Sequence, residues 1–294
     1  LLYISVIFSS CSNLKNKTSK TVFVMNTVCT INLFEDGNDE LYAALSERLF
    51  ELEKIFDVNN PDSAISKVNS SAGSGEEISV SRDFSNVIST ALIAAKFTDG
   101  AFNPLCGALV KLWGINTDNA KVPPVEEIES AIKLCDFNHV NFLPNQSGGG
   151  EVELTKTGMS LDFGGIVKGY AADELVSILR KNNVRRAILD LGGNIYVFGQ
   201  KKDGSLWKVG VKDPDNLSGN PKFVLECKET SIVTSGNYER FLEENGKRYH
   251  HILDCKTGFP AENGISSVTI ECKSSLWADV LSTALFVMGS DRIK

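Results

Sequence analysis

Two residues near the C-terminus have the types and spacing of a cation site. Asp279 and Thr283 lie four residues apart in the otherwise apolar stretch 277–286, so a helix places both on one face. Burying a carboxylate is costly unless it meets a cation or hydrogen-bond donors, and these two side chains offer the oxygen ligands that Mg²⁺ prefers. A simpler interpretation stays open. Asp279 can serve as a first-turn residue favoured by the helix dipole, with Thr283 bonding back to a main-chain carbonyl.

A glycine-containing turn offers a contact for an anion. Gly164 and Gly165 come before Lys168, between a predicted strand and a predicted helix, where backbone N–H groups can meet a phosphate. The stretch is neither a Walker A loop nor a GxGxxG fingerprint. A tight strand-to-helix turn with a solvated Lys168 explains the same residues.

Three histidines are candidates for proton transfer: His139, His250 and His251. His250 and His251 are adjacent in a predicted strand, so their rings point to opposite faces. At most one of the two therefore faces a given site. The sequence contains no GxSxG nucleophile elbow.

The composition limits the class of protein. The chain has 294 residues, of which 42% are hydrophobic and 23% charged, as is typical of a soluble globular protein with a sizeable core. A net charge of −7 argues against a nucleic-acid partner. The seven cysteines show neither CxxC nor a Cys/His zinc spacing, which argues against a disulfide framework or a zinc site.

Short strands and helices without regular βαβ alternation predict an α+β fold. Apolar periodicity predicts helices, and Val, Ile and Thr enrichment predicts strands. The predicted helices are 40–56, 82–98, 168–182 and 275–288. The predicted strands are 22–34, 207–211, 223–227, 231–234 and 266–272, with a strand-rich stretch at 152–162 and a strand pair at 187–198.

The first 20 residues resemble the end of a bacterial lipoprotein signal followed by a polar tether. Cys11 follows an apolar run closed by two serines and precedes the polar stretch 12–20. The run is too short to span a bilayer, and without an initiator Met the signal begins upstream. We expect Cys11 to be lipidated and the protein to be exported, anchored on the periplasmic side of the cytoplasmic membrane. The tail of an ordinary signal peptide is the alternative.

Several motifs, in order along the chain, resemble the ApbE family of FAD:protein FMN transferases. They are 161–173 (LDFGGIVKGYAAD), 190–194 (DLGGN), 234–240 (TSGNYER), 249–258 (YHHILDCKTG) and 278–284 (ADVLSTA). Together they are far more specific than any one motif. The resemblance implies two intertwined α/β subregions with mixed and antiparallel sheets, and an FAD cleft between them. It also implies one domain over 21–294, truncated at its C-terminus where the family continues with a further element.

The resemblance also assigns site residues. It implies that the Mg²⁺ ligands are Asp279, Thr283 and the main-chain carbonyl of Gly165. It implies His251, Lys168 and Asp279 as the catalytic residues. The implied FAD contacts are Met25, Asn26, Thr27, Asn59, Asp162, Lys168, Glu239 and His251.

These residue types suit cleavage of FAD at its pyrophosphate. Mg²⁺ can polarise the phosphoryl oxygens, and Lys168 adds a positive charge. Gly165 leaves room for its carbonyl to approach the metal, and His251 is the candidate for proton transfer. The implied acceptor is a Thr or Ser hydroxyl of a partner protein, a membrane redox subunit by family resemblance, with AMP released.

Asn59 departs from the family pattern, which has Tyr at this position. Losing an aromatic face leaves the flavin less covered, so water could compete and the chain could act as an FAD pyrophosphatase giving FMN and AMP. A non-catalytic FAD-binding lipoprotein is the other alternative, but Lys168 and the Asp279/Thr283 pair argue against it. Alternatively, Asn59 is merely a turn residue before Pro61.

Overall fold

A six-stranded antiparallel sheet is the centre of the fold in the computed structural model, which describes residues 18–292. Its strand order is β1-β2-β6-β7-β10-β13, and each neighbouring pair is antiparallel. The strands are β1 (Thr18–Val24), β2 (Thr27–Phe34), β6 (Ala187–Leu191), β7 (Asn194–Phe198), β10 (Thr230–Gly236) and β13 (Ser267–Cys272). The predicted α+β class is confirmed.

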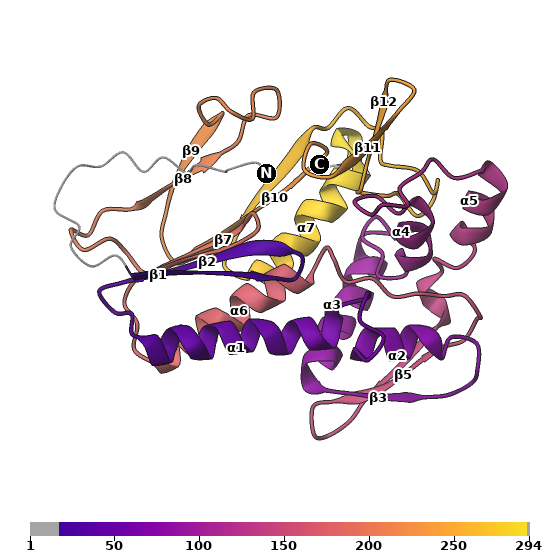
Figure 1. Ribbon diagram of the computed structural model, residues 1–294, viewed down its shortest axis with the longest axis horizontal. Helices are drawn as coiled ribbons and strands as arrows, with labels where there is room; N and C mark the ends of the chain where they lie inside the picture. The colour runs from indigo at the N-terminus through magenta and orange to yellow at the C-terminus, as the bar shows by residue number, and fades with distance from the viewer. Residues whose placement is uncertain (1–17, 293–294) are drawn as a thin grey trace.

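Three helices cover one face of this sheet: α1 (Asp39–Phe56), α6 (Val167–Lys181) and α7 (Ser275–Met288) (Figure 1). The apolar residues of α1 recur at helical spacing, so its buried stripe faces the sheet. In β2, alternate residues Cys29, Ile31 and Leu33 are buried against the same helices. Three of the predicted helices therefore match helices that line the sheet.

A second subregion is built on a three-stranded sheet of order β3-β5-β4. Residues 64–154 contain the strands of this sheet, β3 (Ile78–Val80), β4 (Val140–Pro144) and β5 (Gly150–Leu154), and the helices α2 (Ala64–Ser70), α3 (Arg82–Phe97), α4 (Gly107–Trp113) and α5 (Val125–Ile132). Short 3₁₀ turns lie at Phe137–His139 and, near the C-terminus, at Ser290–Arg292. One apolar core joins this subregion to the large sheet, since it contains Phe84 and Val152 as well as Leu189. The two subregions are therefore intertwined.

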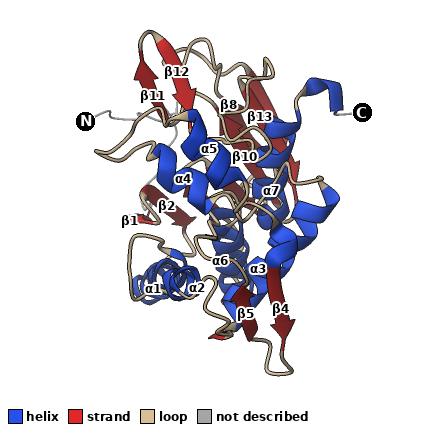
Figure 2. Ribbon diagram, turned by 90° about the vertical axis from the view of Figure 1, so that its right-hand side faces the viewer, coloured by secondary structure: helices blue, strands red, loops and turns tan. Residues whose placement is uncertain are grey.

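Two hairpins stand out from the body. β8 (Trp207–Val211) pairs with β9 (Phe223–Cys227), and β11 (Phe241–Glu244) pairs with β12 (Lys247–His250). The β8–β9 hairpin packs against the outer face of the large sheet through Trp207, Val197 and Ile232. Figure 2 shows the β11–β12 hairpin at the top of the view above α4 and α5, with β4 and β5 at the opposite end.

The prediction of one strand over 22–34 is wrong, because the chain turns back in its middle. Met25 and Asn26 both have φ of 55°, the left-handed conformation that two-residue hairpin turns require. Asn tolerates this conformation, but Met gives no such signal.

The predicted tether also ends earlier than expected, since β1 begins at Thr18. Cys11 and the rest of the predicted signal lie outside the described residues. Within 18–292, no helix combines the length and apolar character needed to cross a membrane.

Candidate functional site

The predicted site residues gather at one end of the large sheet. The β1–β2 turn carries Met25 and Asn26, and the β6–β7 turn lies beside it. A Cβ at Gly192 in that second turn would lie 2.1 Å from the Oγ1 of Thr27. Only glycine therefore allows the two turns to pack this closely.

Helices α6 and α7 cross at Gly169. A Cβ there would lie 2.3 Å from the carbonyl oxygen of Ser275, so the crossing requires glycine. Each helix supplies a carboxylate to the N-terminus of the other. Asp279 accepts a hydrogen bond from the Gly169 N–H at 2.9 Å, and Asp173 accepts from the N–H groups of Ser275 and Leu276 at 2.8 and 3.1 Å. These bonds satisfy N–H groups that a helix leaves unpaired.

The Asp279 carboxylate is almost fully desolvated, with 3% exposure. Burial raises its pKa, while the charge of Lys168, the Gly169 N–H and the nearby Asn194 amide oppose that rise. The Asn194 Nδ2 is itself buried, and no described partner lies within hydrogen-bonding geometry of it. Asp279 is thus a buried acid on which the charge of Lys168 acts without an ion pair, in an environment that a further positive charge would stabilise.

Gly165 and Thr283 lie together, as predicted. A Cβ at position 165 would lie 3.1 Å from Thr283 Oγ1 and 3.3 Å from the Phe102 ring. Within 18–292, the hydroxyl of Thr283 has one hydrogen-bond partner, Ser235 Oγ at 3.5 Å. The alternative in which Thr283 bonds back to a main-chain carbonyl is therefore not what the helix does.

No group of three or more His, Cys, Asp or Glu side chains among the described residues is arranged to hold a metal. A cation bound here would thus depend on one carboxylate and neutral oxygens.

The two adjacent histidines have different surroundings. His250 is buried; its Nδ1 accepts a hydrogen bond from the Ile252 N–H at 3.3 Å, and its Nε2 lies 3.2 Å from the Ala261 carbonyl. His251 has a different partner, since its Nδ1 lies 3.1 Å from the Arg240 carbonyl. His250 is therefore structural, while the ring of His251 is available to the site.

His251 lies in a cationic environment. Burial lowers its pKa, and the charges of Arg240, Lys168 and His250 lower it further, to about 4, although its hydrogen bond to the Arg240 backbone opposes the shift. The ring is therefore neutral at physiological pH.

Arg240 is a site residue that the sequence analysis did not single out. Its Nη2 donates to the Asn26 carbonyl at 3.4 Å, and its charge reaches Asp162 as well as His251. Burial raises the pKa of Asp162, opposed by its 2.7 Å hydrogen bond from the Gly164 N–H and by Arg240. A basic residue inside the 234–240 motif was the available signal.

For three predicted residues the structure gives only exposure or contacts outside the Asp279 group. Met25 is half-buried, and its N–H donates to Glu53 Oε1 at 2.7 Å. Glu239 is exposed. Asn59 is exposed in the turn between α1 and α2, where its N–H donates to Asp57 Oδ1 at 2.9 Å. This turn accounts for Asn59 locally and leaves its contact with flavin a prediction.

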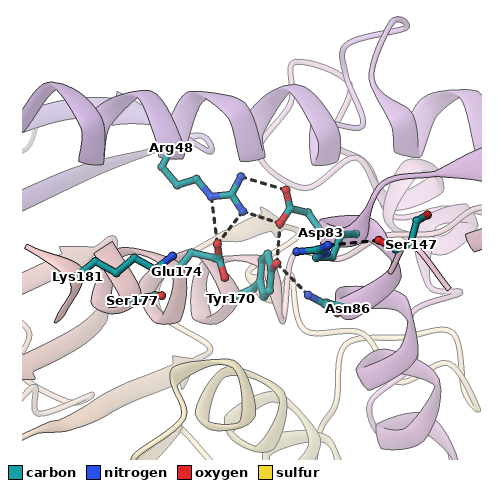
Figure 3. A pocket seen from close by; sticks show the side chains of 9 residues that line it. Arg48, Asp83, Asn86, Ser147, Tyr170, Glu174, Ser177 and Lys181 are labelled. Atoms are coloured by element: carbon teal, nitrogen blue, oxygen red, sulfur yellow. Dashed lines mark hydrogen bonds and ion pairs between the residues drawn. The ribbon is translucent and has the colours of Figure 1, made fainter. Parts of the chain in front are cut away.

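Two cavities lie elsewhere on the described surface. One, of about 490 Å³, opens between α1, α3 and α6 (Figure 3). The other, of about 290 Å³, adjoins residues 254–263. Neither is lined by a predicted site residue.

The charged groups of the larger cavity pair with one another. Arg48 Nη2 lies 2.5 Å from Asp83 Oδ1 and 2.8 Å from Glu174 Oε2, and the Tyr170 hydroxyl donates to Asp83 at 2.7 Å (Figure 3). Burial raises the pKa of Asp83, but the hydrogen bonds from Arg48 and Tyr170 outweigh it and lower the pKa below its ordinary value. This network joins three helices.

Comparison with known proteins agrees with this arrangement. The ApbE family model matches residues 25–294. The FAD:protein FMN transferase of Treponema pallidum is 38% identical over 288 residues, covering 93% of this chain and 79% of that protein. The crystal structure of the ApbE protein of Thermotoga maritima superposes with a TM-score of 0.84 at 34% identity, covering 94% of this chain and 88% of that one. The apo flavinyl transferase ApbE of Pseudomonas stutzeri gives a TM-score of 0.81 at 26% identity, covering 94% and 86%. The chain therefore belongs to the ApbE family.

Proposed function

We propose that this chain is an FAD:protein FMN transferase, which moves FMN from FAD to a Thr or Ser hydroxyl of an acceptor protein and releases AMP. The Treponema pallidum relative is named for the transfer. The observation that carries the proposal for this chain is the buried Asp279 carboxylate, on which the charge of Lys168 acts, at the sheet end where Gly165 meets Thr283.

The donors at this position suit Mg²⁺. Asp279 supplies one carboxylate, Thr283 a hydroxyl and Gly165 a carbonyl, all hard oxygen ligands. The absent side chain at position 165 keeps open the space beside Thr283 Oγ1. Bound there, Mg²⁺ would supply Lewis-acid polarisation of the phosphoryl oxygens.

His251 is suited to take the proton of the acceptor hydroxyl. A carbonyl can only accept, so the 3.1 Å contact with the Arg240 carbonyl assigns the ring proton to Nδ1. Nε2 then carries the free lone pair of a general base. The acceptor oxygen forms a bond to the FMN phosphorus, the pyrophosphate P–O bond breaks, and the departing AMP takes the electron pair.

The overall transfer is tested with purified protein, FAD, Mg²⁺ and a candidate acceptor. FMN attached to the acceptor is the expected product. Free FMN with AMP would favour FAD hydrolysis on the same site, an outcome that the exposed Asn59 makes worth measuring. Unchanged FAD would contradict the proposal and favour a protein that only binds FAD.

Export and anchoring complete the proposal. The apolar run before Cys11 supports a lipidated cysteine on the periplasmic side of the cytoplasmic membrane, where a membrane redox subunit is the expected acceptor. Cys11→Ser should release the protein from membranes and leave activity on a soluble acceptor unchanged. Mass spectrometry of the mature N-terminus measures this directly, and an unmodified cleavage point elsewhere would contradict it.

A further inference from the structure

We infer that Arg240 is a second cationic contact for the pyrophosphate of FAD, acting alongside Lys168. The inference rests on the proposed function, because it concerns the same bound substrate.

Arg240 joins two segments of the site. It lies in the connection between β10 and β11, and its Nη2 contacts the Asn26 carbonyl of the β1–β2 turn at 3.4 Å. Its own carbonyl accepts from the backbone N–H of His251 at 3.1 Å and lies at the same distance from that ring's Nδ1. Arg240 therefore contacts two residues that the ApbE resemblance assigns to FAD, Asn26 through its guanidinium and His251 through its backbone carbonyl.

Arg240 is half-buried as a residue, yet its guanidinium has no carboxylate within 4.0 Å among residues 18–292. Asp162 is the acid whose pKa it lowers, but the two form no direct ion pair. A partly desolvated cation without a partner is unfavourable. A bound pyrophosphate would relieve that cost, and the planar guanidinium can bind phosphate oxygens through two parallel hydrogen bonds.

Arg248 on the neighbouring strand β12 provides the matched control. It pairs with Glu243 at 3.1 Å and lies over the Phe241 ring at 4.0 Å, so its positive charge already has partners within the protein. Arg240 and Arg248 are thus two arginines near one hairpin, of which one is paired and the other is not.

The charge of Lys168 acts on the same histidine as that of Arg240. Both charges lower the pKa of the His251 ring. The neutral ring therefore lies within reach of two cations, an arrangement suited to a substrate that carries charge on both phosphates.

The test measures binding of FAD and of riboflavin, which lacks the phosphates, by calorimetry in EDTA. Arg240→Gln should weaken FAD by at least about tenfold, the usual range for a hydrogen bond to a charged group, and leave riboflavin unchanged. Arg240→Lys should recover part of the loss, because a point charge remains. Arg248→Gln should leave both affinities unchanged.

Equal losses of FAD and riboflavin affinity in Arg240→Gln, or no loss of either, would overturn the inference. A purely structural role of Arg240 would change both affinities by the same factor. The conservative Arg240→Lys decides the question if the glutamine variant does not fold. It must then weaken FAD and spare riboflavin, and FAD binding at the wild-type level would overturn the inference. A wild-type protein that binds no FAD would instead contradict the proposed function itself.

Discussion

Two charged regions share helix α6, and they use charge in opposite ways. Around the larger cavity, Arg48 meets Asp83 and Glu174 directly, so each charge is neutralised within the protein (Figure 3). At the sheet end, Lys168 and Arg240 form no ion pair within 4.0 Å among the described residues. The first arrangement stabilises the fold. The second leaves cations available for an anionic substrate. Charged groups that the protein does not neutralise itself are typical of a functional site.

We expect the largest effect from removing the Asp279 carboxylate at the sheet end. Asp279→Asn keeps an acceptor for the Gly169 N–H but removes the negative charge. Turnover should fall at least roughly a hundredfold, because losing the metal ligand removes several kcal/mol of transition-state stabilisation. Asp83→Asn in the paired network should retain turnover per folded molecule. FMN transfer measured across a range of Mg²⁺ concentrations compares the two variants. A wild-type rate for Asp279→Asn at limiting Mg²⁺ would contradict the predicted ligand.

The next effect concerns pH. With a pKa of about 4, His251 stays neutral as pH falls through its ordinary value of 6.5 and becomes protonated only near 4. The acid limb of kcat/KM should therefore lie near pH 4. For a histidine with the ordinary pKa, the neutral fraction at pH 5 would already be lower by roughly 30-fold. Arg240→Gln removes a cation and should move the limb upward. A wild-type limb near pH 6.5 would show that burial and charge do not act as described.

Breaking the paired network should cost stability and spare catalysis. Arg48→Met removes the cation that pairs with Asp83 and Glu174, whose side-chain exposures are 18% and 34%. Full burial would cost 3–5 kcal/mol, and solvent screening reduces this to about 2 kcal/mol. Urea unfolding measures the loss, and Arg248→Gln, whose pair with Glu243 is exposed, should change stability by less than about 1 kcal/mol.

The stability difference between wild type and Arg48→Met should also depend on pH. The pKa of Asp83 is lowered in the folded protein from 3.8, so its contribution is complete above that value. The contribution of Asp83 to stability is lost as the pH falls from 3.8, the unfolded pKa, through the lower folded pKa. In that range the unfolded chain binds the proton and the folded protein does not. An unfolding free-energy difference that stayed constant down to strongly acidic pH would contradict the role of this carboxylate.

The smallest effect is at Asn59. Its turn uses the backbone N–H, so Asn59→Tyr can keep the turn while adding an aromatic face worth about 0.5–1.5 kcal/mol. FAD should bind up to roughly tenfold tighter, and less free FMN should form relative to FMN on the acceptor. Calorimetry and the product ratio measure both. If neither changed, Asn59 would be a turn residue only, without a bearing on hydrolysis.

Local periodicity determined most of the secondary structure. The predicted helix 275–288 coincides with α7 (Ser275–Met288), and the predicted strand pair coincides with β6 and β7 around Gly192 and Gly193. These elements could be predicted because each buries one face, and burial of one face imposes a repeat that a short stretch of sequence records. The pair Asp279 and Thr283 was recognisable for a related reason, since two oxygen-bearing side chains four residues apart lie on one helix face. Gly165, 114 positions before Asp279, was assigned to the same site only by the family resemblance.

Tertiary structure alone decided which charges meet. The hydrogen bond from Gly169 to Asp279 joins residues 110 positions apart, Arg240 reaches Asn26 across 214, and the roles of His250 and His251 differ only through the carbonyls that face them. No local pattern encodes such partners, because electrostatic and hydrogen-bond energies depend on distance in space. Whether a cation is neutralised, like Arg48, or left for a ligand, like Arg240, is settled only when distant segments pack together.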